Sequence, residues 1–321
     1  GDQVDAESMF ALKSLFEKIG IPHIDCRQDN AKLNARQRSS YLFNSTIEGI
    51  DDTDALLIVG SNPRIEAPVM NARIRKRYLT SRLPVAHIGP QADLTYPADH
   101  LGDTSAILAE LVSGKHPFAK VMMVAKRPMI IVGMGALRRS DSAVIQGLLR
   151  EFSDKVGVVT SDWNGYNVLH TAAARVAGLE MGFVPGKGGL DVRGILKAAQ
   201  DGKMKLVWLL GADEIDTTKL ANSFTVYQGH HGDKGASAAD VVLPGAAFSE
   251  KDGLYANFEG RVQVTQRAIF PPGEAKEDWA IIRALSDRLN QSLPFDSHAA
   301  VRSALIDAVP HFANIGEILP G

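Results

Sequence analysis

Short apolar runs alternate with amphipathic stretches along this chain, and the alternation narrows the folds open to it. Runs at residues 54–60, 128–133 and 205–211 are apolar at nearly every position, and each ends in glycine. Stretches after the first two runs, up to residue 79 and at 141–152, carry apolar residues at helical spacing. Strands that are apolar on both faces are typical of parallel sheets covered by helices. The sequence therefore predicts an α/β fold of doubly wound, mostly parallel sheets.

The same alternation predicts how the chain divides. The most linker-like stretch is at residues 183–189, where Pro and Gly are concentrated. It separates a first α/β lobe at residues 1–184 from a second at 185–292, and a helical tail at 293–321 follows. Further strands are expected at 83–89, 156–160, 224–228 and 239–244, and further helices at 5–19, 103–112, 167–177, 190–199, 277–289 and 298–308.

Composition excludes several classes of function. The net charge of −2 over 321 residues offers no attraction for nucleic acid. No apolar run approaches the roughly 20 residues that cross a bilayer, so direct membrane insertion is not expected. Cys26 is the single cysteine, so the chain can form neither an internal disulfide nor an iron–sulphur cluster alone. The chain begins at Gly1 with a helix following at once, and we expect it to be a piece of a longer polypeptide.

No catalytic or metal-binding constellation stands out. The chain has no Gly-x-Ser-x-Gly, phosphate-loop, His-Glu-x-x-His or Cys-x-x-Cys motif. His230 and His231 are adjacent, but neighbouring residues of an extended segment point to opposite faces and no third ligand is close in sequence. Cys26 is interpreted as a partly buried residue without a redox role. We therefore expect no catalytic residue and no metal ligand.

One glycine turn resembles a dinucleotide fingerprint. Gly133, Gly135 and Arg138 follow a predicted strand, but Arg138 occupies the position where the fingerprint needs a third glycine. Asp162, expected near the end of the next strand, is late for a ribose-binding acid. We interpret the segment as a tight turn between strand and helix that holds no ligand.

Two other turns lie where doubly wound sheets bind ligands, at the carboxyl ends of strands. The first contains Gly60, Asn62 and Pro63, and the second begins at Gly211. Small residues allow a phosphate to approach the backbone, and a helix that follows favours anions. In the second turn, however, the acidic residues 213 and 214 would repel a phosphate.

A basic cluster is the remaining feature that composition does not explain. Arg73, Arg75, Lys76 and Arg77 lie close together on one predicted helix. Such a cluster is commonly a solvated face, and in a chain of negative net charge it can also dock an acidic partner. Both interpretations remain open from sequence.

Several runs resemble the molybdopterin oxidoreductase superfamily, and within it most closely the large iron–sulphur subunit of respiratory NADH:quinone oxidoreductase, complex I. The resemblance extends from about residue 38 to 294. It is carried by Ile65-Glu66-Ala67-Pro68, Asn71-Ala72-Arg73-Ile74-Arg75-Lys76, Asp93-Leu94-Thr95-Tyr96, Tyr227-Gln228-Gly229-His230-His231-Gly232-Asp233, Ala239-Asp240-Val241-Val242-Leu243-Pro244-Gly245 and Glu259-Gly260-Arg261.

The resemblance implies a formate dehydrogenase-like pair of lobes without a cofactor of their own. Gly60, Asn62, Pro63 and Gly211 then correspond to a vestigial pterin cleft. Iron–sulphur clusters are expected in a Cys-rich region of the parent subunit that would precede residue 1. The chain would be a non-catalytic structural and docking region that supports NADH-to-quinone electron transfer in the peripheral arm.

The implied partners are the other peripheral-arm subunits. The implied location is the cytoplasmic face of a bacterial inner membrane, or the matrix face in a mitochondrion, within a membrane-bound complex. A first alternative is a fragment of a catalytic molybdopterin oxidoreductase such as formate dehydrogenase or nitrate reductase. A second alternative is a free-standing nucleotide-binding α/β module.

Overall fold

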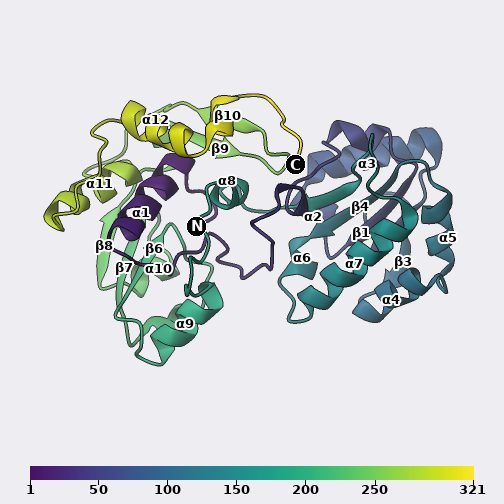
Figure 1. Ribbon diagram of the computed structural model, residues 1–321, viewed down its shortest axis with the longest axis horizontal. Coiled ribbons are helices and arrows are strands. Elements are labelled where there is room, and N and C mark those ends of the chain that lie inside the picture. Colours follow the sequence, from purple (N-terminus) through teal and green to yellow (C-terminus); the bar gives the residue numbers. More distant parts are fainter. The chain divides into compact units, whose positions relative to one another are not determined.

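The computed structural model describes residues 1–321 as two units (Figure 1). The central unit comprises Ala31–Thr171 with Pro320–Gly321, and the flanking unit comprises Gly1–Asn30 with Ala172–Leu319. Both are α/β with parallel sheets, as the alternation of apolar runs predicts. Each unit is described separately below.

The central unit is built on a five-stranded parallel sheet of order β3-β2-β1-β4-β5. All five residues of β1 are buried, which explains why this run has no polar position. The strand order reverses at β1, next to β4, so this sheet is doubly wound. The strands are β1 Ala55–Val59, β2 Val85–Ile88, β3 Asp99–Gly102, β4 Pro128–Gly133 and β5 Tyr166–Leu169.

Helices cover both faces of this sheet. Right-handed crossovers place α3 on one face and α4, α5 and α7 on the other. In agreement, α4, α5 and α7 contact one another, while α3 contacts the 3₁₀ turn η2. The helical elements are η1 Arg38–Ser40, η2 Glu48–Asp51, α2 Pro63–Glu66, α3 Pro68–Ser81, α4 Ser105–Ser113, α5 Pro117–Val124, α6 Met134–Leu137 and α7 Ser142–Val156.

The flanking unit has a three-stranded parallel sheet, β6-β7-β8, and an antiparallel hairpin of β9 and β10. Helix α9 covers one face of the sheet through a core around Ala199, Val207, Leu209 and Tyr227. The elements are α1 Ala6–Lys18, α8 Arg175–Glu180, α9 Val192–Gln200, β6 Leu206–Leu210, η3 Thr217–Leu220, β7 Phe224–Gly229, α10 Lys234–Ser237, β8 Val241–Pro244, η4 Phe248–Glu250, β9 Gly253–Ala256, β10 Val262–Thr265, α11 Asp278–Arg288, α12 His298–Ala308 and η5 Pro310–Ala313.

A buried ion cluster ties the start of the chain into the flanking unit. Lys251 Nζ lies 2.7 Å from Asp5 Oδ2 and 2.6 Å from Asp278 Oδ2, and all three side chains are nearly inaccessible to solvent. Burial alone would lower the pKa of Lys251, but the two carboxylates hold it above its ordinary value. Asp5 also caps α1 by accepting a hydrogen bond from the Ser8 N–H. The cluster joins segments almost 250 residues apart in sequence.

The unit boundaries therefore differ from those predicted at 184/185 and 292/293. Residues 1–30 and 172–184 belong to the flanking unit because α1 packs against α11, α12 and β9. The tail is part of the same unit, since α12 contacts α1. The predicted linker at 183–189 also packs inside it, where the Gly186 N–H donates to the Pro22 carbonyl.

Most predicted elements are confirmed, and β4 and α12 have the expected bounds. The strand expected at 156–160 and the helix expected at 167–177 are wrong. Helix α7 extends to Val156 and ends at Gly157, whose φ is +69°, and the strand is β5. Asp162 consequently precedes β5 instead of following a strand, which removes its analogy to a ribose-binding acid.

Candidate functional site

A crevice of about 300 Å³ opens at the carboxyl end of β1 in the central unit. It lies beside the reversal of strand order, the position where doubly wound sheets bind ligands. Gly60, Ser61 and Asn62 line it, together with the end of β2 and the beginning of α4. Pro63 follows as the first residue of α2. The structure thus brings together three of the four residues predicted for a vestigial cleft.

Gly60 is required by a close contact between two backbone turns. Its φ is +64°, and a Cβ there would lie 2.3 Å from the Ala136 backbone nitrogen. Conversely, Cβ atoms at Gly133 and Gly135 would lie 2.4 and 2.6 Å from the Gly60 carbonyl oxygen. The fingerprint-like Gly-x-Gly therefore packs against the other turn, a structural role that agrees with its interpretation as a tight turn.

A carboxylate from the chain itself occupies the donors of the Gly60 turn. Glu66 Oε2 accepts from Ser61 Oγ at 2.9 Å, and Glu66 Oε1 accepts from the Asn62 backbone N–H at 2.8 Å. Asn62 Oδ1 is buried and has no hydrogen-bond partner. Glu66 is not among the predicted site residues, although an acid in the first helical turn is a known partner of such donors.

Two histidines, His87 on β2 and His100 on β3, contact backbone carbonyls near this turn. His87 is buried, and its Nε2 lies 3.0 Å from the Ser61 carbonyl oxygen. Burial, opposed only in part by that hydrogen bond, lowers the pKa of His87, so the ring is neutral and donates to the carbonyl. His100 Nε2 is likewise 2.8 Å from the Gly89 carbonyl oxygen. These rings hold the backbone in place.

The arginine at the crevice is already paired. Arg139 makes a bidentate contact with Asp141, with Nε 2.7 Å from Oδ1 and Nη2 2.9 Å from Oδ2. The hydrogen bonds from Arg139 lower the pKa of Asp141 to about 2, so the carboxylate stays charged at neutral pH. The positive charge that a phosphate would use is therefore largely neutralised.

The corresponding strand end in the flanking unit is acidic. Gly211 follows β6 with φ +56°, and a pocket of about 460 Å³ beyond it is lined by Asp213, Glu214, Asp233, Lys234 and Ile215. Burial and then the Glu214 carboxylate raise the pKa of Asp213 to about 6. No α-helix follows β6 directly, because only the 3₁₀ turn η3 separates β6 from β7, although the four-residue helix α10 begins at Lys234 in the pocket lining. Gly211, the fourth predicted residue, thus belongs to a separate site in the other unit.

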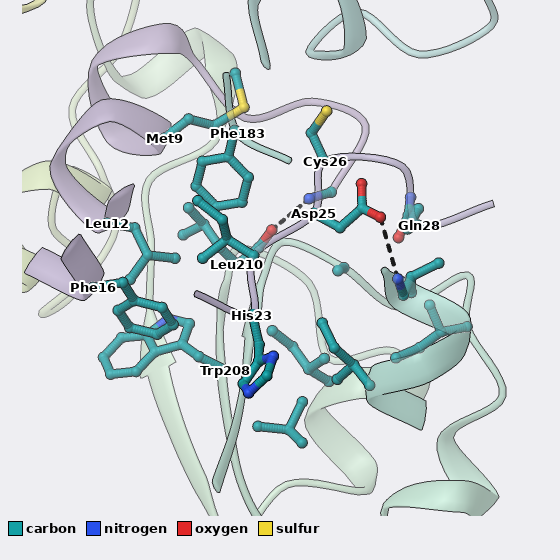
Figure 2. Close-up of a pocket in the computed structure, with 18 of the residues that line it drawn as sticks. Met9, Leu12, Phe16, His23, Asp25, Cys26, Gln28, Phe183, Trp208 and Leu210 are labelled. Atoms are coloured by element: carbon teal, nitrogen blue, oxygen red, sulfur yellow. Dashed lines mark hydrogen bonds between the residues drawn. The ribbon is translucent and has the colours of Figure 1, made fainter. Parts of the chain in front are cut away.

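Cys26 lies at an apolar cavity of about 100 Å³ in the flanking unit. Figure 2 shows the side chains around it, which include Met9, Leu12, Phe16, Phe183 and Leu210. Burial raises the pKa of the Cys26 thiol to about 12, so the group is neutral. Its backbone N–H donates to the Phe183 carbonyl at 2.9 Å. The geometry is that of a packed structural cysteine.

His230 and His231 do not form part of a ligand cluster. Their ring centroids are 4.4 Å apart, and burial lowers the pKa of His230. No group of three or more His, Cys, Asp or Glu side chains is arranged to hold a metal ion. The pair lines a shallow pocket beside β8.

Comparison with known proteins identifies the family to which this chain belongs. Residues 1–288 match the sequence model of the molybdopterin oxidoreductase family. The chain is 44% identical over 324 residues to the mitochondrial NADH-ubiquinone oxidoreductase 78 kDa subunit of Candida albicans, covering 100% of the chain and 43% of that protein. It is 40% identical over 332 residues to the NADH-ubiquinone oxidoreductase 75 kDa subunit of Reclinomonas americana, covering 99% and 47%. The chain spans about half the length of the curated relatives it matches.

Solved structures share the fold at low sequence identity. One is the formyltransferase/hydrolase complex of Methylorubrum extorquens, with a TM-score of 0.66 and 16% identity over 91% of this chain and 90% of that one. Another is acetylene hydratase from Pelobacter acetylenicus, with a TM-score of 0.60 and 14% identity over 98% and 56%. None of the helices in our chain is long and apolar enough to cross a bilayer. The 40–44% identity to complex I subunits over almost the whole chain confirms the predicted resemblance to the large iron–sulphur subunit.

Proposed function

Because the chain belongs to the molybdopterin oxidoreductase family, we propose that it is the non-catalytic structural and docking region of an NADH:quinone oxidoreductase iron–sulphur subunit. The observation that carries the proposal is the 40–44% identity to such subunits over 99–100% of this chain. In this role the region supports NADH-to-quinone electron transfer in the peripheral arm, and clusters held elsewhere carry the electrons.

A pterin dinucleotide, which the family implies, fits these strand ends poorly. Its phosphates would need backbone N–H groups that point into the crevice, and Glu66 already accepts from the Asn62 N–H. In the flanking unit, three carboxylates and one cation, Lys234, line the pocket, and the excess of negative charge repels an anion. We therefore derive no chemical step from such a group.

The donor set for a molybdenum or tungsten ion is equally unsuited. Metal ligation by cysteine needs the thiolate, and the Cys26 thiol has a pKa raised to about 12. The other possible ligands at this cavity are engaged, because Asp25 pairs with Arg27 and His23 Nδ1 accepts from the Leu190 N–H. The chemistry of the residues therefore supports a structural role over the alternative of a catalytic molybdopterin oxidoreductase fragment.

The proposed partners are the other subunits of the peripheral arm. The proposed location is the cytoplasmic face of a bacterial inner membrane or the matrix face of a mitochondrial one. Contact with the membrane would then pass through those partners.

The test is to resolve gently solubilised membranes of the source cell on a native gel and probe with an antibody to this chain. We expect the chain to migrate with a large complex that oxidises NADH in the gel. Elemental analysis of the same band should find iron without molybdenum or tungsten. A smaller species that carries molybdenum or tungsten and lacks NADH oxidation would overturn the proposal.

A further inference from the structure

Helix α3 of the central unit exposes large apolar side chains on the face opposite its core. Met70, Asn71 and Ile74 are buried on the inner side. On the outer side Val69 is 85% exposed and Leu79 is 55% exposed. Single exposed apolar residues are common on protein surfaces. The arrangement of these residues therefore decides whether the face is a binding surface.

The outer residues form one line along the helix. Val69, Ala72, Lys76 and Leu79 are all exposed and are spaced by three, four and three positions. Ile65, in the preceding short helix α2, is 76% exposed, but the non-helical Ala67 separates it from α3 and it is not part of this line. Alternating three- and four-residue steps place side chains in a seam that another helix can pack against. We call Val69, Ala72, Lys76 and Leu79 the α3 seam.

The charge around the seam has one sign. Helix α3 carries four cationic residues and no acid. The acids nearby are already paired, because Asp51 binds Arg73 at 2.6 Å and Asp93 binds Arg64 at 2.5 Å. Lys76 lies within the seam and is exposed to solvent. Asp51 is close enough to interact with Lys76 but accepts its hydrogen bond from Arg73, so the surface around Lys76 keeps an excess of positive charge.

An exposed valine elsewhere in this unit lacks this pattern. Val144 on α7 is 57% exposed, and the exposed residues three to six positions beyond it are Gly147 and Arg150. An isolated exposed residue does not form a continuous apolar surface against which a partner helix could pack. Val144 is consequently a matched control for Val69, since both are valines on the outer face of a helix in the same unit.

We propose that the α3 seam binds an amphipathic helix of a partner protein. Val69, Ala72 and Leu79 pack against its apolar stripe, and Lys76 pairs with an acidic side chain at the middle of that stripe. With 14 residues, α3 presents a surface about 20 Å long, enough for four turns of the partner. The proposal rests on the proposed function in one respect, that the partner is another subunit of the same assembly.

The experiment places a photo-crosslinking amino acid at position 69, and in a second strain at position 144, in the intact complex. After irradiation, mass spectrometry identifies the crosslinked peptides. We expect position 69 to capture one partner segment with helical apolar spacing and an acidic residue, and position 144 to capture none. A captured basic or extended segment, a second copy of this chain, or equal yields at both positions would overturn the proposal.

Charge reversal tests the pairing. Lys76→Glu combined with Val69→Asp should reduce retention of that partner in the purified complex about tenfold, equivalent to about 1.4 kcal/mol. When the acid of the captured segment is replaced with lysine, the chain that carries Lys76→Glu alone should retain that partner again. Val144→Asp should leave retention unchanged. Retention that is insensitive to both seam substitutions would contradict the proposal.

The two proposals fail separately. If the chain does not migrate with an NADH-oxidising complex, the proposed function is overturned whatever the seam binds. If it does so migrate and position 69 captures no acidic helix, only the seam proposal is overturned. Thermal unfolding of the isolated variants controls for folding, and because Val69 and Lys76 are exposed we expect their midpoints to match the unaltered chain.

Discussion

The strand ends after β1 and β6 begin alike and then diverge. Each apolar strand is followed by a glycine with positive φ, +64° at Gly60 and +56° at Gly211. After β1 the chain enters a helix, and Glu66 satisfies the free donors of the turn. After β6 there is only a 3₁₀ turn, and Asp213 stands beside Glu214.

This difference shows that an anion site can be lost in two physical ways. In the central unit the chain supplies its own carboxylate to donors that a phosphate would use. In the flanking unit the carboxylates repel an anion, and the strand is not followed directly by a helix whose N-terminus could attract it. Glycine at the end of a parallel strand therefore indicates the fold, and the residues that follow decide whether a ligand can bind.

The largest expected effect is at the turn of the central unit. Gly60→Ala places a Cβ 2.3 Å from the Ala136 nitrogen in a left-handed conformation. We expect a loss of about 1–2 kcal/mol from the backbone and about 1–3 kcal/mol more from overpacking. Hydrogen exchange of peptides from β1 and β4 measures the loss locally in this unit.

Gly157→Ala separates the two contributions. Gly157 has φ +69°, and no atom lies within 4 Å of a Cβ built there. It should therefore lose only the backbone part, about 1–2 kcal/mol. Equal losses at Gly60 and Gly157 would show that the two turns do not pack as tightly as described.

Removing the carboxylate of the central unit should partly restore an anion site. Glu66→Ala leaves Ser61 Oγ and the Asn62 N–H without their acceptor, at a cost of about 1–3 kcal/mol. Sulfate should then raise the unfolding temperature of the variant more than that of the unaltered chain, because it can accept from the freed donors. Sodium chloride at matched ionic strength is the control. Identical sulfate responses would mean that Glu66 does not block the turn.

The local pattern of apolar residues correctly predicted the strands that are apolar throughout. It failed where contacts with distant residues determine the secondary structure. Residues 128–133 offer no solvent-facing position, so a buried strand is the only outcome. In β5, the buried Asn167 accepts from the Ser45 N–H at 2.9 Å, a partner 122 residues away. The segment at 156–159 instead contains the end of α7, where Val156 is the last helical residue and the Val158 N–H donates to the Ser153 carbonyl.

In the candidate site, too, some features could be predicted from the local sequence and others depend on distant contacts. Gly60, Asn62 and Pro63 could be placed from their position after a strand, because the carboxyl ends of parallel strands meet at one edge. The unit boundaries could not, since Lys251 joins Asp5 to Asp278 across most of the sequence. Whether donors in a turn are free depends on such contacts, which the spacing of residues does not encode.

A smaller effect is expected at the corresponding glycine of the flanking unit. A Cβ at Gly211 would lie 3.2 Å from Val4 Cγ2, a methyl group that can shift slightly. Gly211→Ala should therefore lose mainly the backbone part, about 1–2 kcal/mol, as Gly157→Ala does. Hydrogen exchange of β6 and β7 peptides measures it. A loss as large as that of Gly60→Ala would remove the contrast between a packed turn and an open one.

The smallest effect should depend on pH and come from the acidic strand end. Burial and Glu214 raise the pKa of Asp213 to about 6 from an ordinary 3.8. A raised pKa favours the folded state below pH 3.8, and this advantage is lost as pH rises through 6. Asp213→Asn should therefore be more stable than the unaltered chain at pH 7, by less than about 1 kcal/mol after solvent screening, with the difference disappearing near pH 4. Urea unfolding at both pH values provides the measurement.

Asp201→Asn supplies the opposite sign in the same unit. The hydrogen bond from Lys197 lowers the pKa of Asp201, so its contribution is present above pH 3.8 and is lost as pH falls through the folded value. That variant should be less stable at pH 7 and equal to the unaltered chain in acid. If both substitutions shift stability in the same direction at pH 7, the carboxylates after β6 do not repel one another as their spacing requires. The acidic strand end would then be open to an anion, and its contrast with the Glu66 turn would rest on the missing helix alone.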